Sequence, residues 1–268
     1  MPPIVEIINP TGEGGAMTGM CAPLSGPADK ARLARPLERG PYVVASKDRK
    51  TVLKMLVLSR DEAGYDPDTY ALSPLSAEAD PELIARLRAT WTLAQFTFES
   101  HDAAVYPALD FLLGVCSRMA LLSDGLVADA VSQRYLLPDE VFFPHRADPR
   151  IDARDHVAVR FRDRPEGTHA FTLGMQKFSL PEYEITALDP SETESAARFL
   201  LVIAQTVLVG NFTKEGMLYG SERAPFEARI GGFDRSLWEG IDVFELLPPT
   251  KLTAGEALLA WQQDTAGA

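Results

Sequence analysis

Two long apolar segments with helical spacing constrain the fold of this chain most. The first contains Phe111-Leu112-Leu113 and the second contains Phe199-Leu200-Leu201, and further apolar residues follow each at helical intervals. A helix that is apolar nearly all round must be covered on more than one side. We therefore expect both helices to lie inside the fold, each against a β-sheet.

Both helices have recognisable ends. Ser191 and Glu194 have the spacing of a capping box, which predicts a helix over about 192–209 that ends near Gly210. Pro107 predicts that the first helix begins near it. A second capping box, formed by Thr253 and Glu256, predicts a further helix after residue 253.

Strand patterns surround these helices. Alternating or continuously apolar runs predict strands at 4–8, 42–45, 52–58, 91–98 and 183–187, and a hairpin of 157–161 with 169–173. If burial fixes the hairpin register, Val159 faces Phe171 and His169 lies across from Phe161. His156 then points to the opposite face, so His156 and His169 do not share a metal ion.

The strands and helices follow the same order twice. This predicts an α+β fold of two related halves, each a mostly antiparallel sheet packed on a long apolar helix. Residues 1–40 form an N-terminal arm, 41–145 the first half and 146–268 the second half, packed as one unit with the first. The similarity reflects either an internal duplication or only the periodicity that any two buried helices share.

Charge and motifs exclude several classes of function. The net charge of −12 argues against a protein that binds nucleic acid through phosphates. The N-terminus lacks the features of a signal peptide, and the apolar run 196–210 is shorter than the roughly 20 residues that a membrane span needs. We therefore expect a cytoplasmic protein that does not contact membranes.

Cofactor and metal motifs are incomplete. A GxGxxG motif would need glycine where Met17 stands, and the two cysteines, Cys21 and Cys116, form no CxxC pair. We expect neither a cofactor nor a metal.

Four residues are candidates for catalysis. His101 and Asp102 are adjacent at a strand-to-helix junction, where an imidazole beside a carboxylate could act as a base, although capping of the turn before Pro107 is the simpler explanation. Glu182 and Glu184 share one face of a strand and could act as paired carboxylates. Such neighbours are usually only the solvent-exposed face of a strand.

The segment Thr172-Leu173-Gly174-Met175-Gln176-Lys177-Phe178-Ser179-Leu180-Pro181-Glu182-Tyr183-Glu184-Ile185 resembles a pattern in uncharacterised bacterial domains and is loosely similar to suppressor-of-fused-like proteins. The resemblance covers about residues 90–220. It implies a non-catalytic α+β protein that binds a partner, and it assigns no catalytic residue. The pattern is also explained if Gly174 and Pro181 shape a turn between strands.

These observations favour a non-catalytic bacterial protein-interaction factor, immunity-like or adaptor-like, that binds a protein partner through an acidic surface. The first alternative is a hydrolase-type enzyme with a site in the cleft between the halves, using His101, Asp102, Glu182 or Glu184. The second alternative is a structural subunit of a larger assembly. The oligomeric state stays open.

Overall fold

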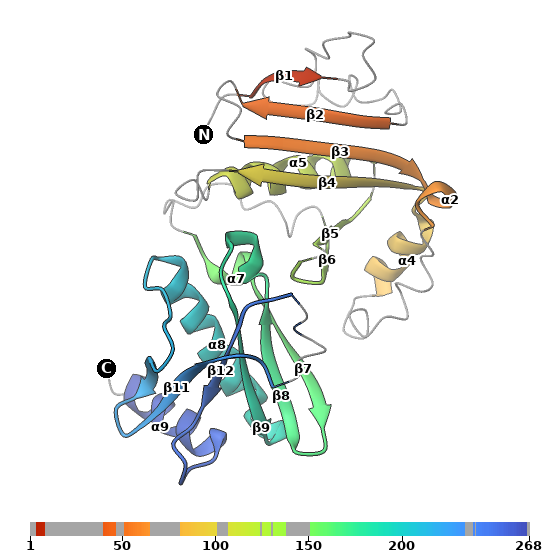
Figure 1. The fold of residues 1–268 in the computed structure, drawn as a ribbon. Helices are drawn as coiled ribbons and strands as arrows, with labels where there is room; N and C mark the ends of the chain where they lie inside the picture. The colour runs from red at the N-terminus through yellow and green to blue at the C-terminus, as the bar shows by residue number, and fades with distance from the viewer. Residues whose placement is uncertain are drawn as a thin grey trace. The chain divides into compact units, whose positions relative to one another are not determined.

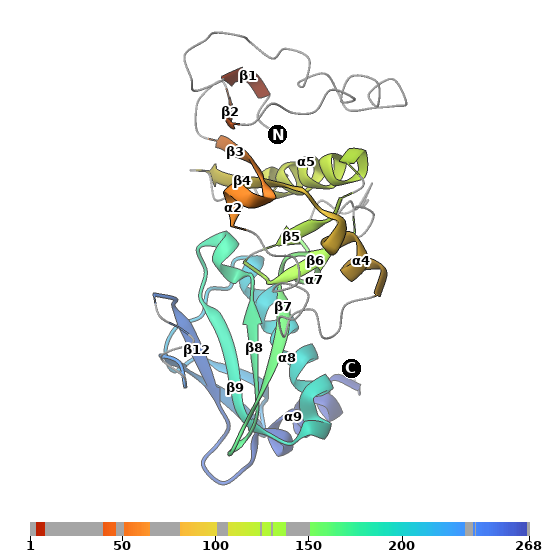
Figure 2. The ribbon, with the colours of Figure 1, turned by 90° about the vertical axis from the view of Figure 1, so that its right-hand side faces the viewer.

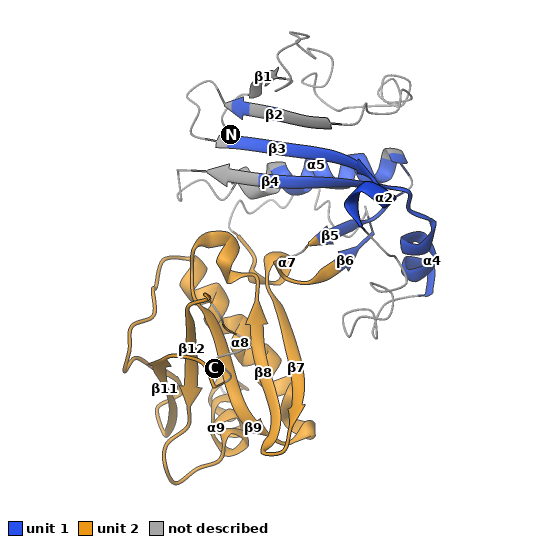
Figure 3. Ribbon diagram, turned by 45° about the vertical axis from the view of Figure 1, so that its right-hand side comes forward, with its two compact units in different colours: residues 1–128, 135–149 blue, residues 129–134, 150–268 orange. Residues whose placement is uncertain are grey.

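The computed structural model describes residues 4–8, 40–46, 51–64, 81–100, 107–123, 125–129, 131–137, 151–233, 238 and 240–266. These ranges contain both helices and strands, so the α+β class is confirmed. The chain divides into two compact units, one of residues 1–128 and 135–149 and one of residues 129–134 and 150–268 (Figure 3). Packing of the two halves as one unit stays a prediction.

The first unit contains an antiparallel sheet in the order β1-β2-β3-β4. Its elements are β1 (Ile4–Ile8), β2 (Gly40–Ser46), β3 (Thr51–Ser59), α2 (Arg60–Ala63), α4 (Pro81–Ala89), β4 (Thr92–Ser100) and α5 (Pro107–Ser123). The predicted helix start at Pro107 is confirmed. Met55 and Val57 of β3 pack with Met119 of α5, which places this helix on the sheet.

The short strands β5 (Val127–Asp129) and β6 (Arg134–Leu136) pair with each other. The turn that joins them belongs to the second unit.

The second unit contains a larger sheet in the order β10-β11-β12-β9-β8-β7 (Figure 1). Its elements are α7 (Ala153–His156), β7 (Ala158–Arg164), β8 (Gly167–Leu173), the 3-10 helix η2 (Met175–Phe178), β9 (Glu182–Leu188), η3 (Pro190–Glu192), α8 (Thr193–Leu208), β10 (Leu218–Ser221), β11 (Ala224–Ile230), β12 (Val243–Leu247) and α9 (Ala254–Ala266). All neighbouring strands are antiparallel except β12 and β9, which are parallel.

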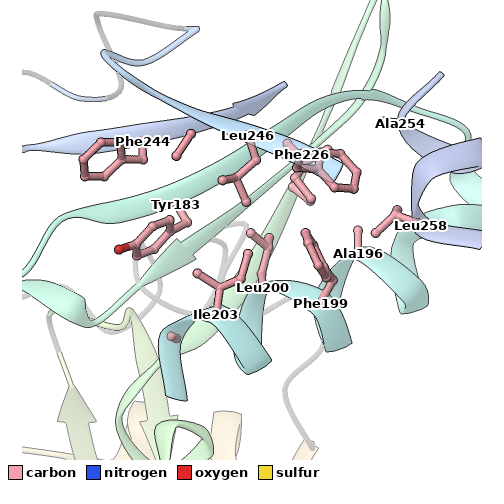
Figure 4. Close-up of a cluster of buried hydrophobic side chains, with 14 of the residues drawn as sticks. Tyr183, Ala196, Phe199, Leu200, Ile203, Phe226, Phe244, Leu246, Ala254 and Leu258 are labelled. Atoms are coloured by element: carbon pink, nitrogen blue, oxygen red, sulfur yellow. The ribbon is translucent and has the colours of Figure 1, made fainter. Parts of the chain in front are cut away.

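Helices α8 and α9 cover one face of this sheet (Figure 2). Phe199, Leu200 and Ile203 of α8 point at strand residues such as Tyr183 and Phe226 (Figure 4). Burial of these side chains removes apolar surface from water, which is the main favourable term in folding. Helix α8 packs against β8 and β9, but Val202 on its other side is 49% exposed, so the helix is not covered on all sides.

The predicted register of the hairpin is wrong by one residue. Val159 lies opposite Thr172, Arg160 opposite Phe171, and Arg162 opposite His169. His156 lies in α7 and not on the strand. Strand β8 is buried on both faces, so the alternation on which the prediction depends is absent from this strand.

The predicted capping box before α8 is also displaced. Asp189 and Glu192 form the box: the Glu192 carboxylate accepts from the Asp189 backbone N–H at 2.8 Å. Pro190 follows Asp189 at the first position of η3, where its fixed φ and missing N–H suit the start of a helical turn. The box of Thr253 and Glu256 at the start of α9 is confirmed.

An internal duplication stays a prediction. The N-terminal arm, apart from residues 4–8 and 40, lies outside the described residues, and so do His101 and Asp102. In the part of the chain that the structure describes, no helix is both long and apolar enough to cross a membrane.

Candidate functional site

The two candidate glutamates lie two residues apart on β9, and neither is on a solvent-exposed face. Glu182 is 1% exposed and Glu184 is fully buried at 0%. The expectation that they form the wet face of a strand is wrong. Whether they take part in catalysis stays a prediction, as it does for His101 and Asp102.

The burial of Glu184 follows from the position of β9 in the sheet. Strands β8 and β12 flank β9, and α8 and α9 pack on one of its faces. On the other face, Phe171, Leu173 and Val243 form a second apolar cluster with Trp238, which precedes β12. A carboxylate in such a place must be hydrogen-bonded, because an unpaired buried charge is too costly.

Glu184 accepts hydrogen bonds from three parts of the second unit. The His169 Nε2 lies 2.8 Å from its Oε2, and the Trp238 indole N–H donates to the same oxygen at 2.6 Å. The backbone N–H of Phe233 donates to the other oxygen. Glu184, on β9, therefore holds β8 and two residues of the segment between β11 and β12 against its own strand.

His169 has the arrangement of an acid–base residue but not the access. A carboxylate at one ring nitrogen orients a histidine as in catalytic pairs. The other nitrogen, Nδ1, is buried and has no hydrogen-bond partner among the described residues. Because the side chain is only 1% exposed and packs against Phe171 and Phe233, a substrate could not reach it without opening the fold. The pair holds the structure together in this conformation.

Glu245 lies next to Glu184 and, unlike Glu184 and His169, is partly exposed to solvent. It lies opposite Glu184 on the neighbouring strand β12 and is partly buried. Burial raises the pKa of Glu245, and the negative charge of Glu184 raises it further. The Thr186 hydroxyl donates to it at 3.5 Å, a long and weak contact.

Glu182 holds the turn between β8 and β9. Its Oε1 accepts from the backbone N–H groups of Gly174 at 2.8 Å and Gln176 at 3.4 Å, and its Oε2 accepts from the Thr172 hydroxyl at 2.7 Å. Burial raises the pKa of Glu182, and these hydrogen bonds oppose that effect. A local role in the turn thus accounts for the Pro-Glu part of the motif 172–185.

Gly174 explains another part of the motif. Its φ of +131° is a conformation that other residues rarely adopt, and a Cβ there would lie 2.2 Å from the His156 carbonyl oxygen. The turn therefore requires glycine for two independent reasons.

A second charged cluster joins η2 to the turn between β5 and β6. The Lys177 ammonium pairs with the Asp129 carboxylate and donates to the His156 carbonyl at 2.8 Å. Burial lowers the pKa of Lys177, and Asp129 opposes that effect. Burial would raise the pKa of Asp129, but the charge of Lys177 and hydrogen bonds from Lys177 and Ser132 lower it overall.

Sequence reasoning did not find Asp129, Lys177, Trp238 or Glu245. The first two lie 48 positions apart and carry no joint motif. Glu245 offered one usable signal, because it lies between the apolar residues Phe244 and Leu246 in a short strand-like run.

Within the described ranges, no three His, Cys, Asp or Glu side chains gather in a way that could hold a metal ion. Comparisons of the chain with protein-family models, with curated proteins and with solved structures gave no match.

Proposed function

We propose that this chain is a non-catalytic bacterial protein-interaction factor, immunity-like or adaptor-like, that works in the cytoplasm and binds a basic protein partner through an acidic surface. The proposal rests on one observation, an acidic end of the second unit. We define this acidic end as Glu166, Asp189, Glu192, Glu194 and Glu256.

Contacts within the second unit bring these residues to the same end. A Cβ on Gly255, in the first turn of α9, would fall 1.5 Å from the Glu192 Oε1, so the beginnings of α8 and α9 are adjacent. A Cβ on Gly167 would lie 2.8 Å from the Leu188 carbonyl oxygen, which places the hairpin turn with Glu166 beside Asp189. Helix capping explains Asp189, Glu192 and Glu256 individually. The proposal adds that their combined field attracts a basic partner.

The burial of Glu182 and Glu184 makes the hydrolase alternative less attractive. Both carboxylates are saturated by hydrogen bonds within the second unit, and a substrate would have to displace those bonds. A resemblance to suppressor-of-fused-like proteins, which implies partner binding, agrees with the proposal. We also propose that the chain consists of two related halves that arose by internal duplication.

Affinity capture with charge-reversed variants tests the proposal. The tagged full chain is incubated with bacterial lysate at moderate salt, and retained proteins are identified by mass spectrometry. Glu166→Lys with Glu194→Lys reverses two charges of the acidic end without touching a capping bond, and breaks the exposed ion pair of Glu194 with Arg198. Asp242→Lys reverses an exposed charge next to β12 and is the control. We expect a basic protein that the wild type and the control retain and the double variant loses.

Salt provides a second readout, because contacts between exposed charges weaken as ionic strength rises. The retained partner should dissociate in high salt. Retention that is equal for all three chains, or no retained protein at all, would contradict binding through the acidic end.

A further inference from the structure

The two edges of the six-stranded sheet differ in how they are protected. Strand β7 carries Arg160, Arg162, Asp163 and Arg164, and the Arg160 guanidinium donates to the Gln133 carbonyl at 2.7 Å. Charged side chains of this kind prevent an edge strand from pairing with another chain. The opposite edge, β10, has the sequence Leu-Tyr-Gly-Ser and carries no charge.

The backbone of β10 has hydrogen-bonding groups directed to the open edge. The Ala228 N–H donates to the Met217 carbonyl at 2.8 Å, so the alternation of an antiparallel ladder turns the N–H and C=O groups of Leu218 and Gly220 away from β11. Among the described residues, none donates to or accepts from these groups. An exposed ladder edge is a template for a further strand.

The side chains of β10 are complementary to a second copy of the same strand. Leu218 is 60% exposed. Gly220, two residues later, has no side chain, and at its φ of +96° the position of a Cβ points toward Phe199 and Phe226. If two β10 strands pair in antiparallel fashion about Tyr219, each Leu218 lies opposite the partner copy's equivalent of position 220. The leucine then lies beside a residue that has no side chain of its own.

The charges that flank β10 fit the same arrangement. Lys214 and Glu215 precede the strand, and Glu222 and Arg223 form the turn after it. Antiparallel pairing brings the beginning of one strand beside the end of the other. Glu215, in the turn before β10, then comes to the same end of the interface as Arg223, in the turn after β10 of the other copy, twice across the symmetry axis. Within its own chain, the Arg223 guanidinium lies 3.8 Å from the Asp264 carboxylate.

From these observations we propose that two copies of this chain associate through β10 and form one continuous antiparallel sheet across a two-fold axis. The inference is independent of the proposed function, because β10 is not part of the acidic end.

Sedimentation equilibrium of the full chain tests this dimer. At about 100 μM protein, a dimer with a micromolar Kd is largely formed, and dilution shifts it toward monomer. Leu218→Lys places a charge on the edge and should leave only monomer. Leu259→Lys alters a residue of α9 that is 53% exposed and serves as the control, which should dimerise like the wild type.

A charge exchange gives the sharper test. Glu215→Arg or Arg223→Glu alone creates like charges at both ends of the interface and should weaken the dimer about tenfold or more. The double variant restores opposite charges and should restore the dimer. Circular dichroism shows that each variant is folded. A wild type that stays monomeric, a dimer that survives Leu218→Lys, or a double variant that is no better than either single variant would overturn the proposal.

Discussion

At the scale of single residues, Glu184 joins three segments of the second unit. Its two oxygens receive hydrogen bonds from the His169 ring, the Trp238 indole and the Phe233 backbone. These donors come from β8 and from the connection between β11 and β12. A buried carboxylate with several donors is stabilised only while all of them stay in place.

We predict that Glu184→Gln lowers the free energy of unfolding by about 1–3 kcal/mol, because an amide accepts hydrogen bonds more weakly and its NH2 group adds a donor beside other donors. Urea unfolding followed by circular dichroism measures the loss. Glu194→Gln, on the exposed surface of α8, is the control and should change the free energy by less than about 0.5 kcal/mol. Equal losses of unfolding free energy in both variants would show that the buried Glu184 contributes no more to stability than an exposed glutamate.

Glu245 makes stability depend on pH in the direction opposite to most carboxylates. Its pKa in the folded chain lies above the ordinary value, so the protonated form favours the fold. The stabilising contribution is present below the unfolded pKa of about 4.3 and is lost as pH rises through the folded pKa.

We therefore predict that Glu245→Gln is more stable than the wild type at pH 7 and that this advantage disappears near pH 4. Chemical unfolding of both chains across this pH range measures the difference. Asp163→Asn, an exposed change on β7, controls for the general effect of removing a charge. If Glu245→Gln is more stable than the wild type by the same amount at pH 7 and pH 4, the raised pKa of Glu245 does not cause the difference.

At the scale of the elements, the turn from β8 to β9 depends on one glycine. Gly174 and Gly210 both have positive φ angles, of +131° and +102°, but only Gly174 lacks room for a Cβ. Alanine substitution at Gly210 therefore tests the backbone conformation alone, whereas the same substitution at Gly174 tests the backbone conformation together with a steric clash.

Gly210→Ala should cost about 1–2 kcal/mol of stability from the backbone conformation alone. Gly174→Ala should cost clearly more than Gly210→Ala, because the methyl group must also displace the His156 carbonyl. Thermal unfolding of both variants compares them. If the two losses are equal, the close approach at Gly174 has no energetic consequence.

The long helices and most of the strands up to β9 were predictable from the sequence, whereas β10, β11, β12 and the pairing of the strands were not. The ends of α5, α8 and α9 follow from proline, glycine and capping residues, which act locally. The hairpin register and the burial of Glu184 depend on partners far along the chain. No local pattern in the sequence indicates that Trp238 and Phe233 cover β9. The face of β9 that carries Glu182 and Glu184 was therefore expected to be exposed to solvent, and it is buried.

At the scale of the whole molecule, the second unit has its own core and also depends on residues 129–134 from an earlier part of the chain. Arg134 donates to the carbonyls of Arg154 and Asp155, and Gln133 accepts from Arg160. The buried Lys177 is paired with Asp129, which precedes α7 by more than twenty residues. A fragment that lacks Asp129 leaves the lysine without its counter-charge.

We predict that a fragment of residues 125–268 folds cooperatively and that a fragment of residues 150–268 is less stable by about 2 kcal/mol, because a buried charge without its partner is destabilising. Urea unfolding compares the two. Asp129→Asn in the longer fragment is the matched variant and should lose a similar amount. A shorter fragment that is equally stable would show that Lys177 does not need Asp129.

The parallel pair of β9 and β12 has a consequence for synthesis of the chain on the ribosome. Strand β12 lies between β9 and β11 but is the last of the six strands to be made. Until it emerges, the meander of β7, β8 and β9 and the hairpin of β10 and β11 are separate, each with an unpaired edge that is later covered. Nascent chains of this protein would thus pass through a stage with two exposed inner edges, during which a chaperone that shields strands would improve the yield.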